Sequence, residues 1–182
     1  MPHHSQRFLI IWFSLLSPLW GSEPEEVIRE YYACLERSEF SKAVDLIDEQ
    51  ALLPTTRSAL LRIRTTPGEK GEIMMRMKLG EALTLEEAGQ LAPRDLYVLF
   101  LENSHNNLVA GIMNRPKEIL LQEMSRTETY CRYSVGVLSS VDPIPGGVLD
   151  PAHRELLQRE AYNTQTVTLR KNGDSWRIVP SL

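Results

Sequence analysis

The sequence contains none of the short motifs that mark several large enzyme classes. A GxSxG nucleophile elbow, a glycine-rich phosphate loop and an HExxH helix are all missing, which argues against α/β hydrolases, P-loop nucleotide hydrolases and zincin metalloproteases. Basic residues are scattered, and the formal net charge is −4 with a pI of about 5.6. Because nucleic-acid binders usually carry a basic patch, we expect no nucleic-acid partner.

Histidine, a common zinc ligand, is scarce as well. Of the 4 histidines, only His105 and His153 lie beyond the N-terminal segment, and neither has metal-ligand spacing to another histidine or to a cysteine. We place His105 in a polar loop, Asn103–Asn107. Methionines at positions 74, 75 and 77 are interpreted as flexible core filler, since no cysteine or histidine is near them in the sequence. The sequence therefore predicts neither a metal site nor a cofactor.

The chain has only 2 cysteines, Cys34 in a predicted helix and Cys131 in a predicted strand. Outside the cytosol such a pair can oxidise to a disulfide, which in the chain-entropy model would contribute about 4–5 kcal/mol. The alternative is two small buried hydrophobic residues that never meet. Neither cysteine belongs to a CxxC motif or has the sequence neighbours of a catalytic nucleophile.

The first residues are predicted to be separate from the fold. Arg7 precedes the apolar run Phe8–Leu16, which is followed by a break at Ser17–Gly21. This pattern predicts a secretory signal peptide over residues 1–21, with cleavage after Gly21 or Ser22. The apolar run is too short for a transmembrane helix, which needs about 20 apolar residues.

We therefore expect an exported protein, periplasmic or extracellular, with no stable membrane span after cleavage. The alternative is an uncleaved N-terminal segment that tethers the protein to a membrane, because Leu19 and Trp20 are not the small residues that a signal peptidase favours. No cysteine follows the apolar run, which argues against a bacterial lipid anchor.

Residues 22–182 are long enough for one domain and show no linker that would divide it. The part from 22 to 107 has helical periodicity, beginning with an apolar stripe at Val27, Ile28, Tyr31, Cys34 and Leu35. A shorter helix is expected from Ser41. Pro54 is expected to interrupt the segment that follows this helix. Further on, Thr84 and Glu87 form a capping box, and Pro93 begins the next helix. That helix is expected to carry an apolar stripe at Leu96, Tyr97, Phe100 and Leu101.

From residue 117 to the C-terminus the period becomes mainly that of strands. We expect one strand at Ile119–Met124, and a second with Thr129, Cys131, Tyr133, Val135 and Val137 on one face. A turn-rich loop at Val141–Pro151 and a helical turn at His153–Arg159 follow.

The last predicted element is a hairpin at Gln165–Val179. Asn172 and Gly173 are typical of a type I′ turn. We expect Trp176 and Ile178 to share one strand face, opposite Val167 and Leu169. An order of helices first and strands last predicts an α+β fold.

Two segments resemble the nuclear-transport-factor-2-like superfamily, which includes ketosteroid isomerase and the SnoaL-type cyclases. They are VIREYYACLERSEFSKAVDLID at positions 27–48 and TVTLRKNGDSWRIV at 166–179. The resemblance implies a cone in which N-terminal helices pack on a curved C-terminal antiparallel sheet, with a pocket at one end. The stretch Leu53–Asn107 would be a helical insertion in the middle of that fold.

The catalytic residues that the resemblance implies are poorly matched. Isomerase chemistry needs an Asp base facing a Tyr and a protonated Asp. Tyr31 or Tyr32 could supply the tyrosine, but the nearest acids, Asp45 and Asp48, belong to the second helix rather than to the family's base position. Near the strand 128–138, Glu128 is the one candidate acid. The epoxide-hydrolase branch would need strand aspartates beside Arg132, and none is present.

Three aromatic residues, Tyr31, Tyr133 and Trp176, are candidate walls of a pocket for a small apolar ligand, with ordinary core residues as the alternative. Our main functional hypothesis is an exported, non-catalytic module that binds a small ligand or a protein partner, with a homodimer through the sheet face as one arrangement. The alternative is a small-molecule isomerase or cyclase with an acid–base site in the cone. A third hypothesis is a structural envelope protein.

Overall fold

The computed structural model describes residues 23–81, 83–107, 112–143 and 161–180. The predicted signal peptide, most of the turn-rich loop and the helical turn at His153–Arg159 lie outside these residues. Within the described part, no helix is long and apolar enough to cross a membrane.

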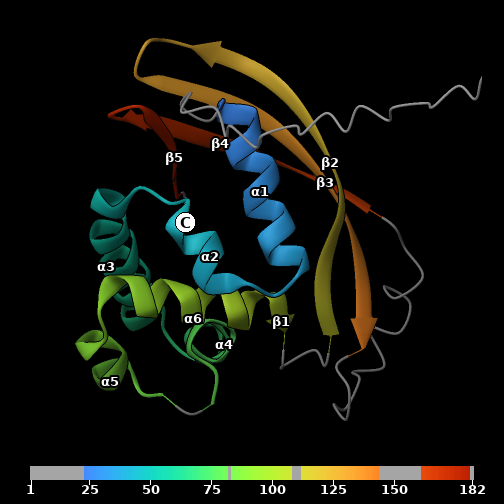
Figure 1. The fold of residues 1–182 in the computed structure, drawn as a ribbon. Helices are drawn as coiled ribbons and strands as arrows, with labels where there is room; N and C mark the ends of the chain where they lie inside the picture. The colour runs from blue at the N-terminus through green and yellow to red at the C-terminus, as the bar shows by residue number, and fades with distance from the viewer. Residues whose placement is uncertain (1–22, 82, 108–111, 144–160, 181–182) are drawn as a thin grey trace, which may run out of the picture.

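In the described part of the chain, six helices precede the main strands of an antiparallel sheet, which confirms the α+β fold (Figure 1). The helices are α1 (Pro24–Glu36), α2 (Phe40–Asp45), α3 (Glu49–Thr65), α4 (Glu69–Leu79), α5 (Leu85–Gln90) and α6 (Pro93–His105). The strands are β1 (Asn106–Asn107), β2 (Ile112–Arg126), β3 (Tyr130–Pro143), β4 (Ala161–Asn172) and β5 (Ser175–Val179). The long strands curve, and α1 lies in the hollow of the curve (Figure 1).

The five strands pair in sequence order, each antiparallel to the next. Beyond β5, the segment after α2 runs parallel to the sheet edge and is bonded to it through Ile178. The Ile178 N–H donates to the Leu46 carbonyl at 2.9 Å, and the Asp48 N–H donates to the Ile178 carbonyl at 2.8 Å. An early segment of the chain therefore pairs with the last strand at Ile178 and covers that part of the sheet edge.

The predicted alternation in β3 is confirmed. Cys131, Tyr133, Val135 and Val137 are all buried, while Thr129 lies just before the strand. They join side chains of α1 and of the final hairpin in one apolar cluster, which consists of Val27, Ile28, Tyr32, Cys131, Tyr133, Val135, Val137, Leu169, Trp176 and Ile178. This cluster fixes α1 against the concave face of the sheet.

The final hairpin is present, but its turn is shifted by one residue. Asn172 pairs with Ser175, so the two turn residues are Gly173 and Asp174. Gly173 has a φ of 62°, whereas Asn172 and Asp174 do not have positive φ. A positive φ at the first turn residue alone is the sign pattern of type II′, not the predicted type I′. Leu169 pairs with Ile178 across the turn, as expected.

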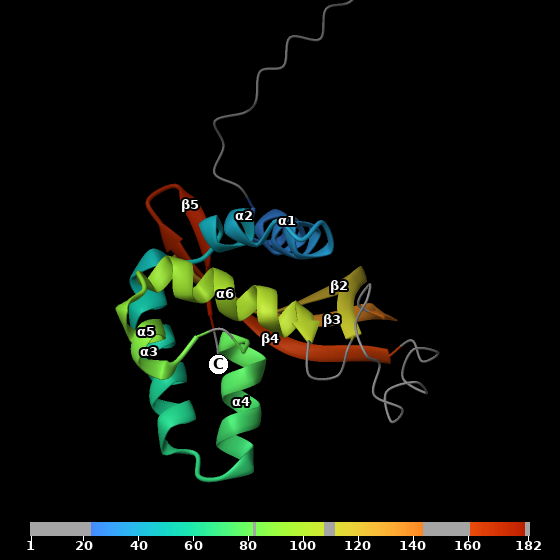
Figure 2. The ribbon, with the colours of Figure 1, turned by 90° about the horizontal axis from the view of Figure 1, so that it is seen from below.

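The helices α2 to α6 enclose a second apolar cluster beside the sheet. Figure 2 shows α3 and α4 side by side, with α6 crossing toward them. The stripe predicted for α6 supplies three of its buried residues, Leu96, Tyr97 and Phe100. The capping box at Thr84 and Glu87 begins α5, and Pro93 is the first residue of α6, both as predicted.

Two predictions of local structure are wrong. Pro54 lies inside α3 rather than interrupting it. Asn103–Asn107 is not a loop, because α6 continues to His105 and Asn106–Asn107 form β1. His105 is buried, with its ring edge-on to that of Phe40 at 5.3 Å. The predicted strand Ile119–Met124 is the middle of the longer β2, which accommodates Pro116 at a shift of register.

Candidate ligand-binding pocket

A cavity of about 230 Å³ opens between α1, α6 and the last two strands. Helix α1 contributes two adjacent tyrosines, and α6 contributes a third from its buried stripe. Strand β4 adds one amide side chain, and Val179 and Pro180 complete the lining. The lining residues are Tyr31, Tyr32, Leu35, Tyr97, Gln165, Thr166, Val167, Ile178, Val179 and Pro180.

The tyrosines are packed by their rings. Tyr31 and Tyr32 lie with ring centroids 5.4 Å apart and planes at 83°, an edge-to-face arrangement that the ring quadrupoles favour. The Tyr32 hydroxyl accepts a hydrogen bond from Nε2 of Gln165 on β4. This bond joins α1 to the sheet and fixes the direction of the Gln165 amide. The hydroxyls of Tyr31 and Tyr97 have no hydrogen-bond partner among the described residues.

The lining residues that the structure describes carry no charge at neutral pH. None of its ten residues is acidic or basic. Burial raises the pKa of Tyr32 to about 12, against the opposing effect of its bond to Gln165, and burial also raises the pKa of Tyr97 to about 12. Burial, together with the neighbouring Tyr97 and Tyr32, raises the pKa of Tyr31 well above its ordinary value. All three side chains therefore stay neutral phenols and can both donate and accept hydrogen bonds.

The structure separates the three predicted pocket aromatics. Tyr31 lines the cavity. Tyr133 is 1% exposed in the core, where its hydroxyl donates to Oε2 of Glu123 at 2.9 Å. Trp176 is also in the core, with the Arg126 guanidinium 6.0 Å from its ring centroid. Neither Tyr133 nor Trp176 is part of the cavity lining.

Sequence reasoning missed Tyr97 and Gln165. Tyr97 was assigned to the apolar stripe of α6, and nothing local distinguishes a stripe residue that packs from one that lines a cavity. Gln165 is paired with Val135, a buried residue of β3. Because of that register, the Gln165 side chain lies on the concave face of the sheet. The sequence signal for this was the alternation of the strand, which places Gln165 on the same face as Val167 and Leu169.

The acids considered for catalysis do not meet in this cavity. Asp48 is fully buried but caps α3, with Oδ1 accepting from the Gln50 N–H at 3.2 Å, and its Oδ2 forms an ion pair with Arg170. Asp45 is exposed. Glu128 and Arg132 are exposed on the hairpin between β2 and β3 and at the start of β3. The lining of the tyrosine cavity includes none of the four.

The two cysteines are free and buried, so the structure contains no disulfide between them. They lie toward opposite ends of α1. The charged neighbours of Cys34 are Glu30, Arg37 and Glu39 near the end of the helix, whereas those of Cys131 include Glu23 at its start. Of the two alternatives, the structure therefore shows separate buried thiols. Burial raises the pKa of both thiols, which lowers their reactivity.

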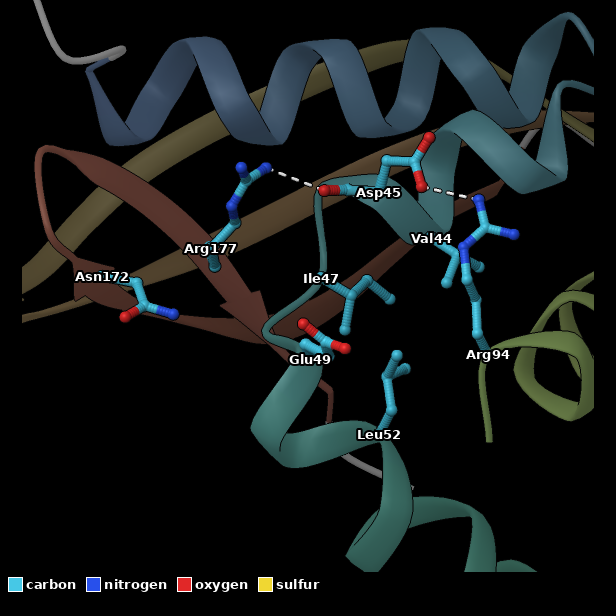
Figure 3. A pocket seen from close by; sticks show the side chains of 8 residues that line it. All are labelled: Val44, Asp45, Ile47, Glu49, Leu52, Arg94, Asn172 and Arg177. Carbon is cyan, nitrogen blue, oxygen red and sulfur yellow. Dashed lines mark hydrogen bonds and ion pairs between the residues drawn. The ribbon is translucent and has the colours of Figure 1, made fainter. Parts of the chain in front are cut away.

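A second, larger hollow of about 380 Å³ lies beside the covered sheet edge (Figure 3). Arg94 forms an ion pair with Asp45 at 2.6 Å, and Arg177 donates to the Asp45 carbonyl at 2.7 Å. Glu49 and Asn172 also line this hollow, so its walls are largely polar and charged, unlike those of the tyrosine cavity. Within the described residues, no group of three or more His, Cys, Asp or Glu could hold a metal ion.

Comparison with known proteins identifies no family for this chain. No protein-family model matches the sequence, and no curated protein matches it. Among solved structures, the chain is similar to one from Campylobacter jejuni described as a "Putative NTF2-like transpeptidase". That similarity has a TM-score of 0.42 and 12% sequence identity, and it covers 86% of this chain and 97% of the other.

Proposed function

We propose that this protein is an exported, non-catalytic module of the NTF2-like type that binds a small uncharged ligand in the tyrosine cavity. The observation that supports this most directly is the lining itself: three neutral phenols, one amide and one threonine among apolar side chains. Ligand sites are usually concave and mostly apolar, with a few polar groups that fix orientation.

The charge balance favours binding over acid–base catalysis. A general base needs a pKa near the working pH, and phenols with pKa values of about 12 are far above it. A ligand with a net charge would enter without an opposite charge to compensate its loss of hydration. The polar groups left for a ligand include the Tyr31 and Tyr97 hydroxyls, the hydroxyl proton of Tyr32 and the side-chain carbonyl oxygen of Gln165. They suit a molecule with a ring or short chain and one or two hydrogen-bonding groups.

The first test is native mass spectrometry of the processed protein purified from its own host under conditions that retain ligands. We expect a reproducible adduct of an uncharged small molecule. Tyr31→Phe and Tyr97→Phe should reduce its occupancy, because each removes a hydroxyl without changing the shape of the wall. Tyr130→Phe is the matched control, since Tyr130 is 46% exposed and outside the lining. A clean apo mass, or an adduct that both pocket variants retain, would contradict the proposal.

A second test addresses the ligand's charge directly. Benzamide, benzoate and benzamidinium have similar shapes and carry charges of zero, minus one and plus one. In protein labelled with 3-fluorotyrosine, benzamide should shift the ¹⁹F signals of Tyr31 and Tyr97 at lower concentration than either ion. Signals would be assigned from the Tyr→Phe variants. A stronger response to benzoate or benzamidinium would show that the cavity selects a charge, contrary to the proposal.

The outer face of the sheet supports a second proposal, a homodimer through that face. Leu120 and Met124 on β2 and Tyr130 on β3 are 54%, 58% and 46% exposed, which is high for large hydrophobic side chains. Sedimentation of the processed protein should then show a dimer that Leu120→Lys converts to a monomer. A monomer at high micromolar concentration would end this proposal without affecting the first.

A further inference from the structure

A separate cavity of about 280 Å³ lies inside the helical part of the molecule, between α3, α4 and α6. Its walls are largely apolar, with Ala59 and Ile63 from α3, Met74 from α4 and Phe100 from α6. Figure 2 shows that α3 and α4 extend away from the sheet, so this cavity belongs to the helices alone. It is not the tyrosine cavity, although the Tyr97 ring lines both.

Two cations belong to this apolar lining. Lys78 is half-buried, and its Nζ donates to the neutral Ser104 hydroxyl at 3.0 Å and lies 6.0 Å from the centroid of the Phe100 ring. Arg62 on α3 is close enough to affect it: burial lowers the pKa of Lys78, and the Arg62 charge lowers it further. Neither cation forms an ion pair with a carboxylate among the described residues.

This arrangement leaves a specific deficit. A half-buried ammonium has lost part of its hydration, which is costly unless an opposite charge compensates it, and here the charge that acts on Lys78 is another cation, Arg62. An anion held between Lys78 and Arg62 would be attracted by both cations and would offset their mutual repulsion. The apolar walls directly behind these cations would at the same time bury the hydrocarbon part of the same molecule.

We propose that the α3–α4–α6 cavity binds a short-chain anionic amphiphile, with its head on Lys78 and Arg62 and its tail against Ala59, Ile63, Met74 and Phe100. The volume of 280 Å³ is just below the roughly 300–1,000 Å³ of drug-sized sites, which limits the tail to a short chain. Met74 suits such a wall, because an unbranched thioether side chain adapts to different tails. This proposal is independent of the tyrosine cavity, which carries no charge.

The test uses three eight-carbon probes that differ in charge: octanoate, octan-1-ol and octylammonium. The processed protein is labelled with ¹³C at the methionine methyl groups, so that Met74 reports on this cavity. Octanoate should shift the Met74 signal saturably. Octan-1-ol should shift the Met74 signal only at a concentration at least roughly tenfold higher, because a hydrogen bond to a charged group is worth about 1.5–3 kcal/mol. Octylammonium should cause no shift. Octyl phosphate in place of octanoate would distinguish a phosphate head from a carboxylate head.

Variants separate the head site from the tail site. Lys78→Met keeps the apolar stem and removes the charge, so it should weaken octanoate by about tenfold and leave octan-1-ol unchanged. Lys78→Arg should retain binding. Lys70→Met is the matched control, because Lys70 is an exposed lysine of the same helix outside the lining. Ala59→Leu should fill the cavity and weaken both probes.

Three results would overturn the proposal: no Met74 shift with octanoate, equal affinity for octanoate and octan-1-ol, or unchanged octanoate binding in Lys78→Met. The comparison of probes on the wild-type protein stands even if a variant fails to fold. Loss of the tyrosine-cavity adduct would not change the Met74 result, so the two proposals can fail separately.

Discussion

Replacing Asp48 by asparagine or alanine should separate two contributions of one buried carboxylate to stability. One oxygen of Asp48 caps α3 through the Gln50 N–H, and the other forms an ion pair with Arg170 on β4. Asparagine is as good an N-cap as aspartate, so Asp48→Asn should lose the charge and keep the cap. Asp48→Ala should lose both.

The expected losses in the free energy of unfolding depend on how exposed the Asp48 and Arg170 side chains are. Removing one partner of a fully buried ion pair costs about 3–5 kcal/mol, because the remaining charge is left unpaired. Here the Asp48 side chain is 1% exposed, but the Arg170 side chain is 28% exposed and would be rehydrated. We therefore expect Asp48→Asn to cost about 2 kcal/mol, below that range. Loss of the cap adds about 1 kcal/mol, so Asp48→Ala should cost about 3 kcal/mol.

Urea unfolding measures both values, with fluorescence of Trp176 as the signal. After removal of residues 1–21, Trp176 is the one tryptophan left, and it is 6% exposed in the core. Asp45→Ala is the matched control. Asp45 also binds an arginine, but the Asp45 and Arg94 side chains are 61% and 45% exposed, and exposed pairs contribute little. An Asp48→Asn variant as stable as the control would refute the assignment of a stabilising buried charge.

Three further outcomes are expected. Gly71→Ala should destabilise the α3–α4 hairpin, because a Cβ there would collide with the Thr66 carbonyl oxygen; an unchanged urea midpoint would contradict this. Cys34 and Cys131 should resist a thiol reagent in the native protein and react with it in urea, since both are buried and their thiol pKa values are raised; mass spectrometry counts the labels, and rapid native labelling would disprove it. Lys78 should lose its proton at lower pH than an exposed lysine, because burial and Arg62 lower its pKa; NMR titration of ¹³C-methylated lysines checks this, and an ordinary pKa would mean that its side chain is hydrated.

The sequence predicted most of the elements whose signals are local. Periodicity found α1, the stripe of α6 and the buried face of β3, and capping chemistry found the starts of α5 and α6. The prediction that Pro54 interrupts its segment was wrong because the cost of a proline inside a helix can be outweighed by the packing of the helix around it. The buried residues Leu52, Thr56, Ala59 and Ile63 of α3 continue one stripe across the proline, and burying that stripe outweighs one lost backbone bond.

The candidate site was less accessible to sequence reasoning. Tyr31 was named, but its partners come from α6 and β4, and their proximity depends on helix packing and strand register rather than on spacing along the chain. Tyr133 and Trp176 have the composition of pocket walls and are core residues instead. Burial alone does not decide between these roles; what decides is whether neighbouring side chains fill the adjacent space.

The bond between the segment after α2 and the last strand has a consequence for how the chain folds. Arg177 and Asp45, which also join across this edge, are 132 positions apart. Contacts of such long range carry a large loop-closure cost and form late in folding. The sheet edge cannot be closed until β5 has been synthesised, so the segment after α2 stays unpaired while the intervening chain is made. For a protein that we propose to be exported, this delay would keep the polypeptide in an extended state suitable for translocation, and it would confine completion of the fold to the far side of the membrane.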